Sequence, residues 1–289
     1  MSADDRTTPA EAGQRANRRG KWGIVSGAVL AALLLAGFLL VRSAWFQTWW
    51  TLRRVRQPGN ITALERWLRG RDLISQLNVD EARDLLVGLD SPAASPLLRA
   101  VEDKDPNLQT VAQFTLWKLG RRAVPGLIEA LQDEQPRVRR RAALRLSQIR
   151  PPPTDAAPAL VHALSDADWG VRETATIALG EIGPAAKDAV SALTRALEDE
   201  EWPVRAAAAH ALAAIGSAAR EAVPALARRL EDEQWPVRAA AAASLGKIGP
   251  AAKATVPALK KLAASDEDRG VRRAAAEALK MVQTEQDAP

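Results

Sequence analysis

Two stretches of the chain are nearly identical: Glu-Glu-Trp-Pro-Val-Arg-Ala-Ala at positions 200–207 and Glu-Gln-Trp-Pro-Val-Arg-Ala-Ala at positions 233–240. The valine of this motif recurs in five copies, at Val138, Val171, Val204, Val237 and Val271. Successive valines are 33, 33, 33 and 34 residues apart. A period of this length over five copies indicates a solenoid, in which each unit buries its apolar face against its neighbours.

Small and apolar residues follow each valine at helical spacing. Alanine stands four residues after it, leucine eight residues after it, and isoleucine or valine eleven residues after it. This spacing predicts an amphipathic helix whose alanine lets a second helix approach closely. Three copies continue with Gly183, Gly216 or Gly249, at the point where the end of a helix favours a positive φ angle.

A second, shorter helix is predicted in each copy. In four copies it begins with a proline, which loses no hydrogen bond in the first helical turn. Its predicted core residues are Leu127, Leu160, Leu193, Leu226 and Leu259. A degenerate copy precedes the five, with Leu108, Ala112, Leu116, Leu119 and Gly120 at the same offsets. Each repeat is therefore predicted to be an antiparallel helix pair, and the fold class to be an all-α solenoid.

Over residues 92–282 the pattern resembles the HEAT-like repeats first described in phycobilisome lyases. The resemblance implies a right-handed α-solenoid with a ladder of ion pairs between adjacent repeats. The residues that match this ladder are Asp133, Arg139, Asp166, Arg172, Asp199, Arg205, Asp232, Arg238, Asp266 and Arg272. Arginine suits such pairs because its planar fork binds two acceptors at once. The degenerate copy has Asp103 but Gln109, so we expect the ladder to end there.

A membrane-spanning segment is predicted before the repeats. Residues 23–41 contain no charge, and at about 1.5 Å per residue they nearly cross a hydrocarbon core of about 30 Å. Tryptophans flank the run on both sides, which suits the two membrane interfaces. The predicted organisation is a disordered polar tail (1–21), a transmembrane helix (22–42), a juxtamembrane helical linker (43–91), the solenoid (92–282) and a frayed tail (283–289).

A cleaved signal peptide is the competing interpretation, with cleavage after Ser43. The apolar run is longer than the 7–15 residues or so of a signal peptide, which favours the anchor. Positive residues lie on both sides of the run, and those at 15–21 lie closer to it. We therefore predict a single-pass membrane protein with extracytoplasmic repeats. The absence of cysteine from the chain fits an oxidising compartment.

The charge of the chain is unevenly distributed. The formal net charge is +5, and residues 1–90 hold 13 Lys and Arg against 9 Asp and Glu. Residues 91–289 hold 27 against 26, so the repeats are nearly neutral. Membrane lipid is thus a predicted partner of residues 22–42, whereas a neutral solenoid is unlike a domain that binds the phosphates of a nucleic acid.

Residues suited to catalysis are few. The chain has no Cys or Tyr, and its two histidines are His162 and His210. HEAT-repeat deoxyhypusine hydroxylases bind iron through His-Glu pairs, whereas Ala163 and Ala211 follow the histidines here. HEAT-like DNA glycosylases use a basic concave surface, and no bilin site of the lyases can be recognised. No catalytic residue, metal site or cofactor is predicted.

Three tryptophans occupy the same position in consecutive repeats. Trp169, Trp202 and Trp235 each lie two residues before the valine of their repeat. They can act as staples that pack on the start of the helix. Alternatively, they form an aromatic ridge for a partner, because tryptophan is frequent at binding hot spots.

A column of polar residues is predicted on the second helices, which line the concave side in this family. Two residues after each buried leucine stand Glu129, His162, Arg195, Arg228 and Lys261, with Arg229 and Lys260 beside them. The column is either a solvated face or a groove for a protein or acidic peptide segment. We predict a membrane-anchored, protein-binding scaffold without catalytic activity. A lyase-like enzyme subunit and a nucleic-acid-binding HEAT protein are the alternatives.

Overall fold

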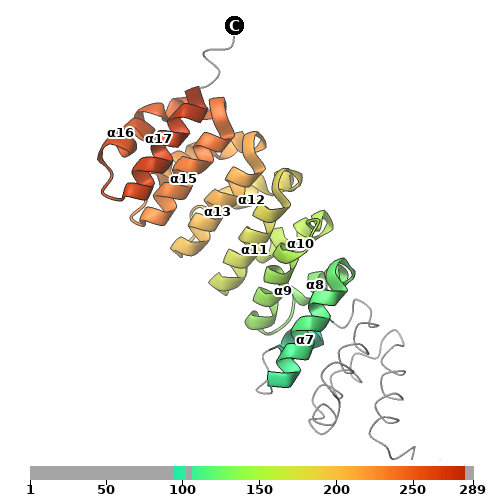
Figure 1. Cartoon of the computed structure of the whole chain (residues 1–289). Helices are drawn as coiled ribbons and strands as arrows, with labels where there is room; N and C mark the ends of the chain where they lie inside the picture. The colour runs from blue at the N-terminus through green and yellow to red at the C-terminus, as the bar shows by residue number, and fades with distance from the viewer. Residues whose placement is uncertain (1–93, 102–105, 284–289) are drawn as a thin grey trace, which may run out of the picture.

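A computed structural model describes residues 94–101 and 106–283, and all regular elements in these two ranges are helical (Figure 1). The predicted tail, transmembrane helix and linker at 1–91 lie outside the described residues, as do residues 284–289. Among the described helices, none combines the length and the apolar character needed to cross a membrane. The last helix reaches Gln283, so this residue belongs to the solenoid and not to the predicted tail.

Long and short helices alternate along the chain. The long helices are α7 (Pro106–Leu119), α9 (Pro136–Gln148), α11 (Trp169–Ile182), α13 (Trp202–Ile215), α15 (Trp235–Ile248) and α17 (Arg269–Gln283). The short helices are α6 (Ala94–Ala100), α8 (Val124–Ala130), α10 (Ala157–Ala163), α12 (Val190–Ala196), α14 (Val223–Arg229) and α16 (Val256–Ser265). Short 3₁₀ segments lead into the last five of these: η2 (Gly120–Ala123), η3 (Thr154–Ala156), η4 (Gly183–Ala189), η5 (Gly216–Ala222) and η6 (Gly249–Thr255). The predicted helix pairs are confirmed.

The core consists of the positions that the repeat pattern identified. In the repeat of α11, Val171, Ala175 and Leu179 have no exposed surface, and the matching residues of the repeats of α9, α13 and α15 are equally buried. In the last repeat Leu279 is only partly buried. Each repeat therefore completes its core with side chains from its neighbours, as expected of a solenoid.

Glycines end three of the long helices. Gly183, Gly216 and Gly249 have φ angles of 65°, 73° and 79°, a region that side chains with a Cβ atom disfavour. Their N–H groups donate back to the carbonyl of the leucine four residues earlier, which closes each helix. The prediction that these glycines terminate helices is confirmed.

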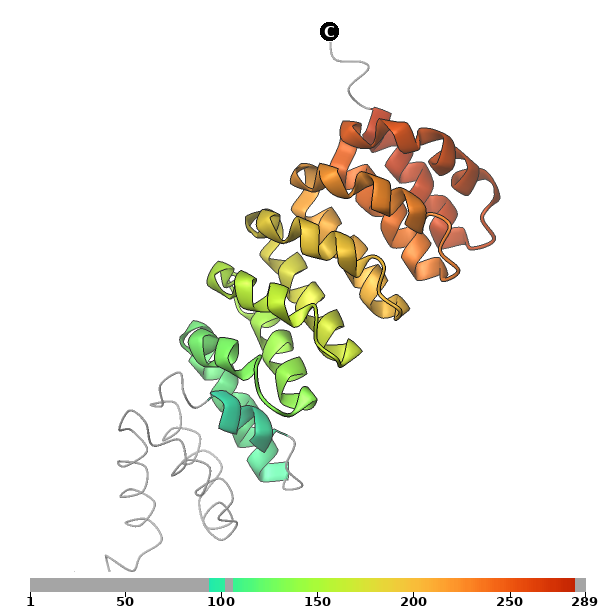
Figure 2. The ribbon, with the colours of Figure 1, turned by 180° about the vertical axis from the view of Figure 1, so that it is seen from behind.

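The long helices form the inner layer of the solenoid. From α9 to α17, consecutive long helices pack directly against one another, whereas consecutive short helices make few direct contacts (Figures 1 and 2). In a curved stack the elements on the inner side lie closer together, so the long-helix face is the concave one. The prediction that the second helices line the concave side is therefore wrong. The alanines that permit close approach lie on the long helices.

Two contacts show how closely the long helices approach. A Cβ atom added to Gly180 of α11 would lie 3.2 Å from the Cα atom of Ala211 in α13. A Cβ atom added to Gly246 of α15 would lie only 2.8 Å from the Cα atom of Ala278 in α17. Glycine and alanine at these paired positions therefore set the spacing between neighbouring repeats.

Replacing Gly246 by Ala is expected to destabilise the protein by about 1–3 kcal/mol, because α15 and α17 must move apart. The intrinsic helix propensity of Ala would favour the variant by about 1 kcal/mol, so a loss of stability identifies the packing contact as the larger effect. Thermal or denaturant unfolding measures the difference. The exposed neighbour Lys247→Ala is the control and should stay within about 0.5 kcal/mol of the parent. A stabilised Gly246→Ala variant would contradict the close contact.

Candidate partner-binding face

Bidentate pairs of arginine and aspartate join successive repeats. Arg139 donates from Nε and Nη2 to the two carboxylate oxygens of Asp166, at 2.6 and 2.7 Å. At distances between 2.7 and 3.0 Å, the same arrangement joins Arg172 to Asp199, Arg205 to Asp232 and Arg238 to Asp266. Each pair therefore links the first turn of one long helix to the turn that precedes the next.

Both partners of a pair also organise the backbone around them. The Nη1 atom of Arg139 donates to the carbonyl oxygens of Asp133 and Glu134, at 2.8 and 3.1 Å. Asp166 Oδ1 accepts a hydrogen bond from the backbone N–H of Asp168 at 2.9 Å. One arginine thus holds the turn of its own repeat and the turn of the next one at the same time.

The pairs favour the charged forms of their members. The hydrogen bond from Arg238 lowers the pKa of the Asp266 carboxyl below its ordinary value, although burial acts in the opposite direction. The same hydrogen bond raises the pKa of Arg238. At Asp199 burial would raise the pKa, but the hydrogen bonds from Arg172 and from the backbone N–H of Glu201 outweigh it, and the pKa is lowered.

The ladder extends further toward the N-terminus than the repeat pattern predicted. Asp133 accepts a hydrogen bond at 2.6 Å from Nη2 of Arg99, which lies on the short helix α6 and outside the repeated arginine position. At the other end Arg272 holds its own turn through the carbonyl oxygens of Asp266 and Glu267. Arg229, predicted to bind a partner, lies 3.3 Å from Asp232 Oδ2 and thus contacts the ladder.

Arg205→Ala should destabilise the protein by about 3–5 kcal/mol, because it leaves the nearly buried carboxylate of Asp232 without its bidentate partner. The exposed Arg220→Ala is the matched control, and its effect should stay within about 0.5 kcal/mol. Denaturant unfolding of both variants measures the difference. Equal unfolding midpoints would show that the pair contributes nothing to the joint between repeats.

The predicted basic column lies on the outer layer. His162, Arg195, Arg228, Lys260 and Lys261 are exposed on the short helices α10, α12, α14 and α16. Arg228 forms an ion pair with Glu198 of the preceding repeat at 2.7 Å, which neutralises the middle of the column. The column therefore borders the convex side.

The tryptophan series lies at the rim of the inner face. Trp169, Trp202 and Trp235 are the first residues of α11, α13 and α15, and their exposed fractions are 42%, 42% and 53%. About half of each indole is therefore available to a partner.

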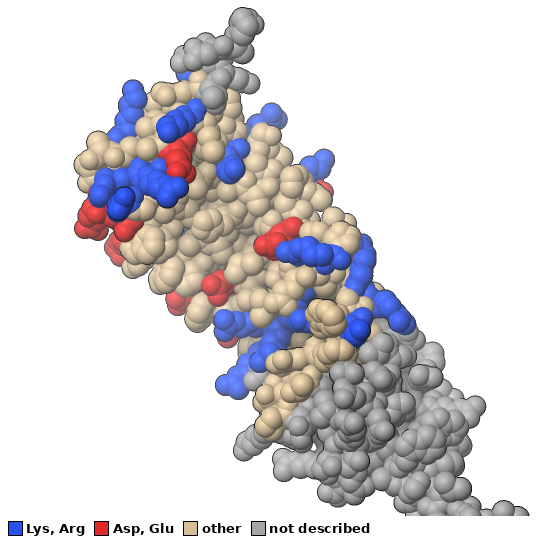
Figure 3. Space-filling view, in the orientation of Figure 1, with Lys and Arg blue, Asp and Glu red and all other residues tan. Residues whose placement is uncertain are grey.

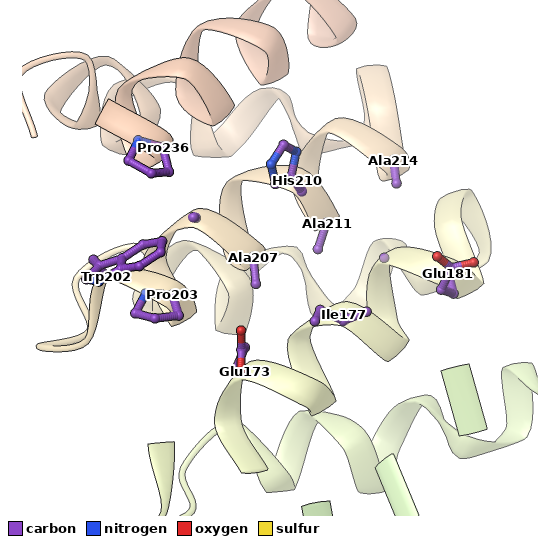
Figure 4. Close-up of a pocket in the computed structure, with 12 residues that line it drawn as sticks. Glu173, Ile177, Glu181, Trp202, Pro203, Ala207, His210, Ala211, Ala214 and Pro236 are labelled. Carbon is purple, nitrogen blue, oxygen red and sulfur yellow. The ribbon is translucent and has the colours of Figure 1, made fainter. Parts of the chain in front are cut away.

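A hollow of about 420 Å³ opens on the inner face between α11 and α13 (Figure 4). Trp202, Pro203 and Pro236 border one end, and Ile177 with Ala207, Ala211 and Ala214 lines the middle. Glu173, Glu181 and His210 supply its polar groups. Glu181 forms an ion pair with Arg150 at 2.6 Å, whereas Glu173 forms no ion pair within the described part of the chain. The hollow is thus an apolar surface with one uncompensated carboxylate.

Neither histidine is placed as a metal ligand. Burial lowers the pKa of the His210 imidazole below its ordinary value. His162 lies apart from it on the outer layer. Within residues 94–101 and 106–283 no group of three or more acidic, histidine or cysteine side chains is arranged to hold a metal ion.

Charged side chains are unevenly distributed along the inner face, which the repeat pattern did not predict. Figure 3 shows a broad area without charged side chains across the middle of this face and basic side chains near α9. Helix α9 contains Arg137, Arg139, Arg140, Arg141 and Arg145, and no acidic residue. Most of the other repeats have Ala, Thr or Ser where Arg141 and Arg145 stand. This departure from the repeat consensus was the available signal.

Comparisons with known proteins agree with this architecture. A family model described as HEAT repeats matches residues 92–180, 157–234 and 217–280. The crystal structure of an engineered protein is 26% identical to the chain with a TM-score of 0.51, and the similarity covers 72% of this chain and 98% of that one. No curated protein gave a significant match.

Two further solved structures are similar at a lower level. The complex of CpcE and CpcF of phycocyanin lyase from Nostoc is 26% identical, with a TM-score of 0.45 and coverage of 65% of this chain and 76% of that one. Computationally designed armadillo repeat proteins for modular peptide recognition are 20% identical, with a TM-score of 0.49 and coverage of 66% and 99%.

Proposed function

The chain belongs to the HEAT-repeat family, and on that premise we propose that it is a membrane-anchored scaffold whose inner face binds a segment of another protein. The hollow between α11 and α13 is the observation that carries the proposal. Its apolar lining and its border of Trp202, Pro203 and Pro236 resemble the apolar centre and aromatic anchors of protein interfaces.

The same lining argues for binding rather than catalysis. An active site needs polar groups that converge on a reacting atom, with a nucleophile, base or metal among them. In the hollow, alanine, isoleucine, proline and tryptophan side chains outnumber the polar ones. A non-catalytic role therefore accounts for the surface better than a lyase-like activity does.

We propose that the partner binds on the inner face and not along the basic column. The inner face is concave, and its exposed residues depart from a solvated helix surface because they include Trp202, Trp235 and Ile177. Exposed apolar side chains that gather on one face mark interaction sites more often than isolated ones do. The basic column lies on the opposite layer, where Arg228 is already paired.

Ala214→Arg is expected to abolish capture of the partner without unfolding the protein. Ala214 is exposed on α13 and lines the hollow, so a long charged side chain there fills the space a partner would occupy. Affinity capture from a detergent extract, followed by mass spectrometry, compares the proteins bound by the parent and the variant. Ala251→Arg makes the same change at an exposed position in η6 and should retain the partner. An unchanged set of captured proteins with Ala214→Arg would exclude the hollow.

Trp202→Ala distinguishes the two interpretations of the tryptophan series. Binding that is lost at an unchanged melting temperature assigns Trp202 to the partner surface. A lower melting temperature would assign it to the packing of the helix start. The exposed fraction of the indole favours the first result.

Membrane anchoring through residues 22–42 is the second part of the proposal. The support is the uncharged run at 23–41, which is about as long as the hydrocarbon core is thick. We place the repeats on the extracytoplasmic side because the basic residues nearest the run precede it. An anchor of this kind would hold the scaffold and its partner beside the membrane.

The full chain should remain in the membrane pellet after carbonate extraction, because about 19 uncharged residues transfer favourably into lipid. A variant that lacks residues 22–42 should appear in the supernatant. Protease added to spheroplasts should degrade the repeats if they face outward. A mature N-terminus at Ala44 would identify a cleaved signal peptide and rule out the anchor.

A further inference from the structure

The stack of long helices opens between α7 and α9. Every later pair of neighbouring long helices packs directly, but α7 and α9 make few direct contacts. Helix α6 packs against both α7 and α9. Leu98 and Val101, from α6 and the turn that follows it, line the opening between the two long helices.

A second hollow occupies this opening, with a volume of about 190 Å³. Its apolar lining comes from Leu98, Val101, Leu116 and Leu144. Its charged groups are the guanidinium groups of Arg141 and Arg145, and Gln113 and Gln148 complete it. The hollow therefore combines an apolar wall with positive charge, on the same inner face as the hollow between α11 and α13.

Arg145 lacks a counter-ion in this hollow. Its Nη1 atom donates to Oε1 of Gln148 at 2.9 Å, and no carboxylate contacts it in the part of the chain that the structure describes. Burial lowers the pKa of its guanidinium, which reflects the unfavourable removal of the charge from water. A partly buried cation gains most from an anion that a partner brings to it.

The first hollow has the opposite charge. Glu173 is half-buried there and forms no ion pair among the described residues, whereas Glu181 is paired with Arg150. One hollow lies between α7 and α9, and the other lies between α11 and α13. Packed helices lie about 8–10 Å apart, and α7 and α9 do not pack directly, so the two hollows are separated by at least about 16–20 Å. An extended chain covers that distance in roughly five or six residues, at about 3.3 Å each.

We propose that the two hollows bind one extended protein segment, with an acidic side chain at Arg145 and a basic side chain at Glu173, roughly five or six residues apart. This inference rests on the proposed function, because it names the chemistry of the segment that the inner face binds. The opposite charges fix the direction in which the segment runs along the solenoid. A reversed segment would place like charges together in both hollows.

A phage-displayed library of random 12-residue peptides, selected on the purified full chain in detergent, tests the proposal. Enriched peptides should carry Asp or Glu at one position and Lys or Arg five or six positions away. Selection on Arg145→Ala should lose the acidic preference and keep the basic one, and selection on Glu173→Gln should do the reverse. Arg195→Ala removes an exposed cation from the outer layer and should change neither preference.

Synthetic peptides from the selection provide a quantitative measure. Fluorescence anisotropy should show about tenfold weaker binding of the parent peptide to Arg145→Ala, as for the loss of one charged contact. The variant should fold, because alanine stands at the matching position of three later repeats, as Ala178, Ala211 and Ala278. A peptide whose acidic residue is replaced by Lys tests the same contact on the unchanged protein, and its binding should also be lost.

Each other outcome has a definite meaning. Enriched peptides without an acidic residue at a fixed distance, or with the same preference on Arg145→Ala, would overturn the two-charge segment and leave the scaffold proposal intact. If no peptide is enriched on any form of the protein, both proposals fail. Binding of the Lys-substituted peptide at full strength would overturn the acidic contact at Arg145 alone.

Discussion

The bidentate joint between Arg205 and Asp232, repeated along the chain, is the interaction on which the solenoid depends. Its two members come from different repeats, and each also fixes a turn of the backbone. A partly buried arginine is stable here because its donors meet carboxylate and carbonyl oxygens at once. The joint therefore sets how one repeat is oriented on the next, and the apolar core fills the space that this orientation leaves.

Small residues bring the later long helices close together. Glycine opposite alanine brings α15 and α17 into direct contact, and the same arrangement joins α11 to α13. The helices α7 and α9 make few direct contacts, and α6 packs against both of them. One hollow lies over the contact between α11 and α13 and the other in the opening between α7 and α9, so a hollow can form with or without direct packing of its two long helices.

The repeat fold could be predicted from the sequence because residues that recur with the repeat period are the buried ones. The valine, alanine and leucine of each copy occupy the core, and the glycines end helices as their positive φ angles require. The choice of the concave layer failed, because it was taken from a resemblance and not from the alanines that let the long helices approach. Arg99, which binds Asp133, was not predicted because it does not stand at the arginine position that the repeats share.

The candidate site was harder to predict for a related physical reason. Repeat counting emphasises what the copies share, whereas a binding surface is built from the positions where they differ. Arg141 and Arg145 interrupt a series of small residues, and Glu173 stands where the next two repeats have Ala206 and Ala239. Arg145 is partly buried in a hollow that depends on the distance between α7 and α9. No local sequence pattern specifies that distance.

The last joint of the ladder shows what the repeat length does and does not control. Arg238 and Asp266 are 28 residues apart, whereas the other pairs are 27 apart, yet the contact distances are the same within a few tenths of an ångström. The short helix in between, α16, continues to Ser265 and takes up the added residue. The geometry of the joint is thus insensitive to the length of chain between its members. Insertions can accumulate on the outer layer during evolution without disturbing the register of the inner one, and an alignment that assumes a fixed period would misplace each residue beyond that point by one.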